Sequence, residues 1–109
     1  MAETFKNAQL QGTSSVSTYA SLYSTTASTT AVVSMIICNT ATTDATYRIA
    51  IMTTEGTPAA ANWVAYDSIV AANDTVSLNI GMTLGNSQYI RVSSSANTVS
   101  FTAFISEIS

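Results

Sequence analysis

The composition of this 109-residue chain excludes several kinds of chemistry. Only 8% of its residues are charged, against about 25% in an average soluble domain, although 47% are hydrophobic. Its polarity comes mainly from 16 Ser and 18 Thr residues. The chain has no His, one Cys and three basic residues. We therefore expect no His-based triad, no internal disulfide, no metal or other cofactor, and no binding of nucleic acid.

The same figures predict a folded protein. A hydrophobic share of 47% with a net charge of only −3 lies outside the range of disordered chains. The longest apolar run, residues 31–38, is far shorter than the roughly 20 residues that cross a bilayer, so no membrane association is expected. The N-terminus has no basic region followed by an apolar stretch, which predicts synthesis in a cytoplasm without a signal peptide. Cys38 is expected to be a small core side chain.

Alternation of polar and apolar residues predicts the first strands. Residues 16–23 form the first of them, and residues 24–30 a flexible polar link. Residues 31–38 are apolar on both faces, which predicts a central strand covered on two sides. Residues 39–44 contain Asn and Asp and predict a turn.

The middle of the chain continues the pattern. Residues 47–52 alternate, and residues 55–58, Glu-Gly-Thr-Pro, end that strand. The one helical element expected is a short turn near residues 58–62. Residues 63–70 predict the next strand, with two candidate inward sets. These sets are Val64, Tyr66 and Val70, or Trp63, Ala65 and Ile69. We favour the second set, which places Trp63 inside.

After a turn at residues 71–74, the alternation is the clearest in the chain. Its apolar members are Val76, Leu78, Ile80 and Met82. Residues 89–92 and 99–105 predict two further strands, and residues 8–13 add an eighth strand if they also pair.

The number of strands and the spacing of the turns predict the fold class. We expect an all-β fold, either an antiparallel β-sandwich or a jelly roll, with seven or eight strands. The expected organisation is an N-terminal arm or edge strand over residues 1–15 and a single sandwich domain over residues 16–109.

The six acidic residues do not form a catalytic or calcium-binding pattern. Asp44 and Asp74 lie in predicted turns, where Asp side chains hydrogen-bond the backbone. Asp67 lies within a predicted strand and is expected to pair across strands with Arg48 or Arg91. A Ser or Cys nucleophile would lack the most common base, because the chain has no His. We therefore expect a protein that is not an enzyme.

Aromatic residues are the remaining candidates for binding. Exposed Trp and Tyr on a sandwich can stack on sugar rings, although a core or subunit interface is the more frequent place for them. Phe101 is predicted to be core, whereas Phe104 is out of phase with it and faces outward. The candidate interface residues are Trp63, Tyr66, Phe104, Tyr19 and Tyr23. The scarcity of Lys and Glu, which protect the edges of isolated sandwiches, predicts that much of the surface is covered in an assembly.

Residues 63–108 contain a series of short motifs in a fixed order. The motifs are Tyr-Asp at 66–67, Ala-Ala-Asn-Asp-Thr at 71–75, Gly-Met-Thr-Leu at 81–84, Ile-Arg-Val at 90–92, Val-Ser-Phe at 99–101 and Glu-Ile at 107–108. In this order they resemble the small β-sandwich virion structural proteins of tailed bacteriophages. The resemblance covers less than half of the chain.

This resemblance implies a structural function without catalysis. A member of the family would be a capsid decoration or cement protein, or a small neck or tail component, made in the host cytoplasm and located in the virion. Its partners would be the major capsid protein or other virion proteins, together with copies of itself, often as a trimer. The alternative is a fibre-associated receptor- or carbohydrate-binding module, in which a glycan is the partner and Trp63 and at least one Tyr are exposed and clustered.

Overall fold

The computed structural model describes residues 2–109, apart from the side chain of Ile80, so the predicted position of Ile80 on an apolar face lies outside the described residues. The described strands are β1 (Glu3–Gln11), β2 (Ala20–Ser24), β3 (Thr30–Asn39), β4 (Ala45–Met52), β5 (Trp63–Val70), β6 (Asp74–Leu84), β7 (Tyr89–Ser94) and β8 (Val99–Ile108). A 3-10 helix, η1 (Ala60–Asn62), precedes β5 at the place where a short helical turn is predicted.

The strands form two four-stranded sheets that pack face to face. One sheet has the order β1-β8-β3-β6, which we call sheet A, and the other has the order β2-β7-β4-β5, which we call sheet B. The chain crosses between the sheets at every connection except β4 to β5, and every described pairing is antiparallel. This is the strand order of a jelly roll, so the predicted all-β sandwich is confirmed.

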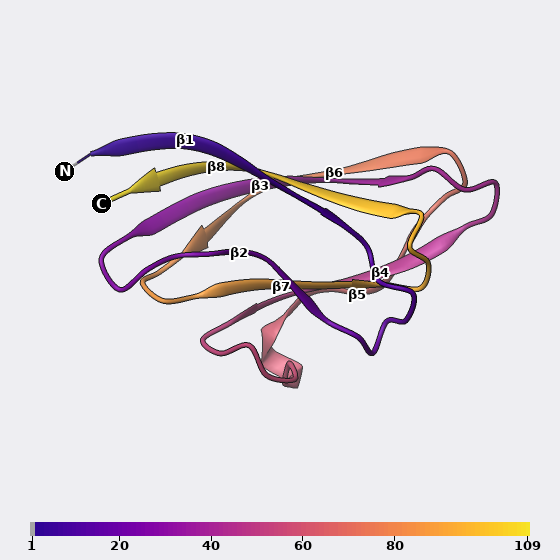
Figure 1. The fold of residues 1–109 in the computed structure, drawn as a ribbon, viewed down its shortest axis with the longest axis horizontal. Coiled ribbons are helices and arrows are strands. Elements are labelled where there is room, and N and C mark those ends of the chain that lie inside the picture. The colour runs from indigo at the N-terminus through magenta and orange to yellow at the C-terminus, as the bar shows by residue number, and fades with distance from the viewer. Residues whose placement is uncertain (1) are drawn as a thin grey trace.

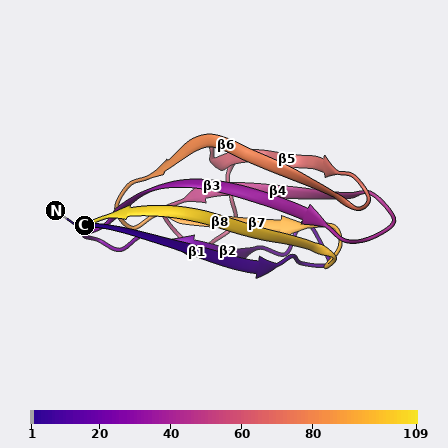
Figure 2. The same ribbon diagram turned by 90° about the horizontal axis from the view of Figure 1, so that it is seen from above.

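The two sheets lie in parallel layers with matching edges. Figure 1 shows both termini at one end of the sandwich. Seen from above, β6 lies near β5 at one edge and β1 near β2 at the other (Figure 2). The strand β1 is therefore an edge strand, paired with β8 over its whole length.

Alternating apolar residues of both sheets fill the space between them. The largest fully buried side chains include Phe101, Met35, Ile37 and Ile49. The Phe101 ring meets Tyr47 edge-on, with the ring centroids 6.4 Å apart. Phe101 therefore lies in the core, as predicted, and strict alternation explains most of β3, β4, β7 and β8.

The prediction for the first strand was wrong in its extent. The strand β2 begins only at Ala20, and residues 16–19 belong to the connection from β1. A β-bulge between Ser21 and Tyr23 shifts the register with β7, so regular alternation does not extend through this segment. The link that follows is polar as expected, but Thr25 is buried in it and donates a hydrogen bond to the carbonyl of Gly85.

The prediction that residues 31–38 are covered on two sides was also wrong. The strand β3 is central in sheet A, and its inward residues are buried. Its outward residue Val32 is 43% exposed, and Cys38, on the same outward side, is half-buried rather than in the core. The other outward residues of β3, such as Ser34 and Ile36, are half-buried, so this face is only partly covered within the chain.

The favoured inward set of β5 was wrong as well. Two register shifts against β4 interrupt the alternation of β5. Val64 and Ala65, which are adjacent in the chain, both pack against the core, whereas Ile69 is 65% exposed. Trp63 lies on the outer side of sheet B. Strict alternation could not find this arrangement, because each bulge reverses the face to which the following residues point.

Candidate contact surfaces

The outer face of sheet A brings together residues from three strands that are distant in the sequence. Phe5 of β1 and Val32 of β3 both pair with Ser106 of β8, so the three side chains point to the same side of the sheet. In the next outward row, Phe104 of β8 pairs with Ser34 of β3. We call the outward side of this sheet the A face.

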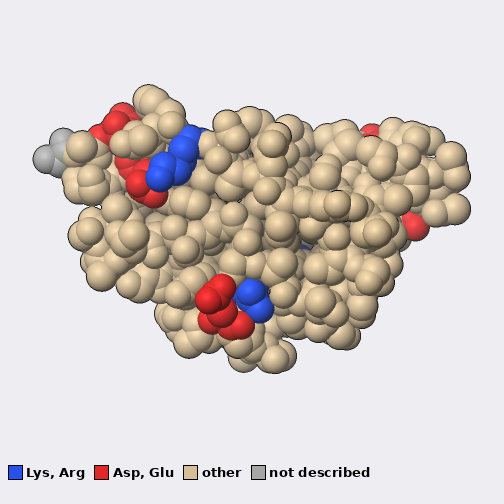
Figure 3. Space-filling view, in the orientation of Figure 1, with Lys and Arg blue, Asp and Glu red and all other residues tan. Residues whose placement is uncertain are grey.

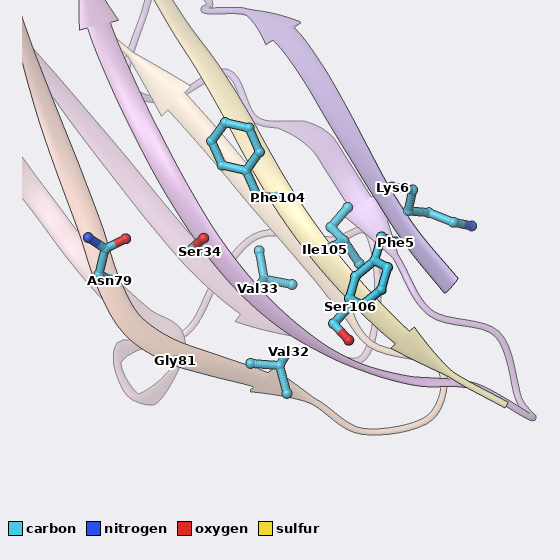
Figure 4. A pocket seen from close by; sticks show the side chains of 10 residues that line it. All are labelled: Phe5, Lys6, Val32, Val33, Ser34, Asn79, Gly81, Phe104, Ile105 and Ser106. Carbon is cyan, nitrogen blue, oxygen red and sulfur yellow. The ribbon is translucent and has the colours of Figure 1, made fainter. Parts of the chain in front are cut away.

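Three large apolar side chains on the A face are exposed to solvent. Phe5 is 76% exposed, Phe104 is 48% exposed and Val32 is 43% exposed. They surround a hollow of about 400 Å³, lined by ten residues of β1, β3, β6 and β8 (Figure 4). The prediction that Phe104 faces outward is confirmed, and the structure adds Phe5 and Val32, which sequence reasoning missed.

A bulge in β6 shapes one side of this hollow. The pairing of Val33 with Met82 and of Met35 with Leu78 leaves three residues of β6 opposite one residue of β3. Gly81, in this bulge, has a φ of +64°, a backbone conformation that residues other than glycine rarely adopt. Because glycine has no side chain, the hollow stays open at this position.

Charged groups lie beside the A face at the end of the sandwich that holds the termini. Glu107 accepts a hydrogen bond from the Tyr23 hydroxyl and forms an ion pair with Lys6, with 3.2 Å between Nζ and Oε1. The Tyr23 hydrogen bond, followed by the one from Lys6, lowers the pKa of the Glu107 carboxyl. Burial, followed by the contact with Glu107, raises the pKa of the Tyr23 phenol. Tyr23 thus closes the edge between β1 and β2 and packs partly against the core.

The outer face of sheet B, which we call the B face, is organised around Arg48. Its Nε and Nη2 atoms donate to the two carboxylate oxygens of Asp67, at 2.7 and 3.2 Å. Asp67 occupies a bulge position with a φ of 50°, a backbone conformation that Asp tolerates better than most residues. At this bulge its carboxylate faces the Arg48 guanidinium. The hydrogen bond from Arg48 lowers the pKa of Asp67. The predicted cross-strand pair is confirmed, with Arg48 as the partner.

Aromatic rings pack around the same guanidinium. Arg48 Cζ lies 4.2 Å from the centroid of Tyr66 and 5.7 Å from that of Trp63, within the range of cation–π contacts. Trp63 meets Tyr66 edge-on at 4.8 Å and Tyr19 at 5.9 Å. Three of the five candidate interface residues therefore form one cluster, in which Tyr66 is 53% exposed and the other two are half-buried.

Part of the B face, around Arg48 and Ser93, is covered by the segment that connects β1 to β2. Arg48 Nη1 donates to the Tyr19 hydroxyl and to the carbonyl of Val16, and Ser93 Oγ also donates to that carbonyl. Beneath this cover, Ala50 and Ser93 are fully buried although they lie on the outward side of sheet B. Trp63 pairs with Ala50 in the β-ladder and helps to bury it.

The described residues of these surfaces include few charged groups. Among residues 2–109, no three His, Cys, Asp or Glu side chains are grouped in a way that could hold a metal ion. Asp44 and Asp74 accept hydrogen bonds from the backbone amides of Ala72 and Thr75. Asp44 lies between strands as predicted, whereas Asp74 is already the first residue of β6. No helix in the described part of the chain is long and apolar enough to span a membrane. On the side of the molecule drawn in Figure 3, charged side chains gather at only a few places and most of the surface is uncharged.

Comparison with known proteins adds no assignment. No protein-family model matches this chain, and no curated protein matches it.

Proposed function

We propose that this protein is a non-enzymatic structural component of a tailed-bacteriophage virion. It acts as a capsid decoration or cement protein, or as a small neck or tail component, and stabilises the particle through protein–protein contacts. The observation that supports this proposal best is the A face, where Phe5, Val32 and Phe104 are exposed together around a hollow. A contiguous exposed apolar patch on a small domain typically marks an interaction site.

The low charge of the chain supports the same proposal. With 8% charged residues, the surface offers mainly hydroxyl and apolar groups, which can be buried against another protein at little cost in charge desolvation. A protein that binds the assembled particle better than its dissociated subunits stabilises the particle by mass action. Adhesion in this sense needs no catalytic residue and no cofactor.

Thermal melting of phage heads tests this function. Heads that lack the protein should melt at a lower temperature than complete heads, and added purified protein should bind them and restore the higher midpoint. Two matched variants accompany this test, and each replaces an exposed apolar residue with a β-branched polar one. Phe104→Thr alters the A face, and Ile69→Thr, on β5, is the control outside that face. Equal melting of heads with and without the protein would contradict the proposed function.

A glycan-binding module is the second candidate, supported by the clustering of Trp63 and Tyr66. Exposed aromatic rings with polar neighbours are the usual platform for a sugar. The Arg48 guanidinium, however, lies 4.2 Å from the centroid of Tyr66, and Trp63 is half-buried, so less ring surface is free for stacking. Titration with host polysaccharide while the Trp63 fluorescence is recorded tests this candidate, and an unchanged spectrum would remove it.

A further inference from the structure

We propose that the A face is a self-association surface, on which a second copy of this chain packs with its own A face about a two-fold axis. This inference rests on the proposed function, because it names a partner for the surface that supports it.

The A face can meet an identical copy without repulsion between like charges. By register, the outward positions of β1, β8 and β3 alternate with the inward ones, and Glu3 is the charged residue among them. Glu3 lies at the end of the sheet and accepts a hydrogen bond from Ser106 Oγ at 2.7 Å. Lys6, at the rim of the hollow, is paired with Glu107. The centre of the face is therefore uncharged, with Ser34, Asn79 and Ser106 among its apolar side chains, and juxtaposed like charges do not oppose pairing.

The size of the A face is sufficient for a weak dimer. Its strands have 9 to 11 residues. At about 3.3 Å per residue and 4.8 Å between strands, the face measures roughly 30 by 18 Å, or about 550 Å². Two such faces would bury about 1,100 Å², just above the roughly 1,000 Å² expected of a specific interface. Pairing should therefore be reversible and depend on protein concentration.

The hollow and the exposed rings are complementary to each other in size. An enclosed cavity of about 150 Å³ accepts a benzene ring. The hollow on the A face measures about 400 Å³ and is therefore large enough for an aromatic side chain of a second copy. In a two-fold contact each copy supplies the same groups, so Phe5 and Phe104 of each copy can pack into the hollow of the other.

Two-fold pairing also determines the number of chains in the assembly. A face that packs against an identical face closes as a dimer, whereas a trimer needs two different patches on each copy. The inference therefore predicts dimers of this chain in solution, in place of the trimers that are frequent in the family it resembles.

Light scattering after size-exclusion chromatography tests the inference, over a concentration series that extends to the highest concentration the protein tolerates. The wild type should shift from one chain to two as concentration rises. Phe104→Thr and Val32→Thr should weaken pairing, with the dissociation constant rising about thirtyfold for Phe104→Thr, as expected when a central aromatic is removed. Ile69→Thr, on β5 of sheet B, should pair like the wild type. Circular dichroism of each variant shows whether the fold is retained.

Several results would overturn the inference. One is a wild type that stays monomeric at all concentrations, and another is a wild-type mass that corresponds to three chains. The third is that Ile69→Thr weakens association as much as Phe104→Thr does. The proposed function fails by a different observation. If the wild type stays monomeric but still binds and stabilises heads, the pairing is refuted and the function stands. If the wild type forms dimers through the A face but leaves the melting of heads unchanged, the function is refuted and the pairing stands.

Discussion

The two sheets of this sandwich have four strands each but differ in what lies over their outer faces. On the B face, the connection from β1 to β2, together with Trp63, buries Ala50 and Ser93. On the A face, Phe5 and Phe104 remain exposed, and no described residue covers them. The B face is thus covered in part within one chain, although Tyr66 and Ile69 of β5 remain exposed. The A face leaves apolar surface in water, which favours contact with another molecule.

Gly12 is the residue through which this difference can be tested with the largest expected effect. A Cβ at Gly12 would overlap Ser94 Oγ and would lie 2.6 Å from the carbonyl oxygen of Val99, so the covering segment would have to move. We expect Gly12→Ala to lower the free energy of unfolding by about 2 to 3 kcal/mol, as overpacking does. Urea denaturation measures this change.

The control for that substitution is Gly56→Ala. Gly56 is exposed, and the nearest atom to its Cβ position is Thr54 Oγ1 at 3.4 Å. Its unfolding midpoint should stay close to that of the wild type. Equal stability of the two variants would show that the segment after β1 is not tightly seated on sheet B.

Removal of one aromatic ring from each face compares the faces directly. Trp63→Ala should cost about 2 kcal/mol of folding free energy, less than a fully buried Trp, because Trp63 is half-buried among Tyr19, Tyr66 and Arg48. Phe104→Ala should cost less than about 1 kcal/mol when measured in dilute solution, where the protein is monomeric. Thermal or urea unfolding of both variants at the same low concentration gives the comparison. A larger loss for Phe104→Ala would mean that the A face is packed within the monomer.

Acidification should produce the smallest effect, at the edge of the sandwich where Tyr23 of β2 meets Glu107 of β8. The Tyr23 and Lys6 hydrogen bonds hold the pKa of Glu107 below its ordinary value of 4.5 in the folded protein. The unfolded chain therefore binds a proton more readily, so this contribution to stability is present above about pH 4.5 and is lost as the pH falls through the lower folded pKa. The urea midpoint of the wild type should fall in that range, and that of Glu107→Gln should fall less. Parallel pH profiles for the two proteins would contradict the assigned role of Glu107.

Regular alternation was sufficient to predict the fold class and most of the strands. It placed Phe101 in the core and Phe104 outside it, because both lie in β8, whose ten residues alternate without a bulge. It failed on β5, where two register shifts bring Val64 and Ala65 to the core and place Trp63 outside. A bulge depends on the pairing of two strands, so the residues of one strand alone do not reveal it.

The contact surfaces were predictable only in part. Asp67 and Arg48 could be proposed as a pair, since opposite charges on neighbouring strands attract. The A face was missed, because Phe5 and Val32 become neighbours only through the order β1-β8-β3, in which distant segments of the chain lie side by side. Likewise, the apolar residues of β3 indicate burial on both faces, but they do not show that Val32 on the outer face stays exposed.

The most direct test of the account is a dilution series followed by nuclear magnetic resonance, with assigned methyl and aromatic signals. The signals of Phe5, Val32 and Phe104 should move as concentration rises, whereas those of Tyr66 and Ile69 should stay unchanged, although both are also exposed. This result would locate self-association on the A face. Shifts centred on Tyr66 and Ile69, or no shift at any concentration, would contradict the central claim that the uncovered face of sheet A is where copies of this chain meet.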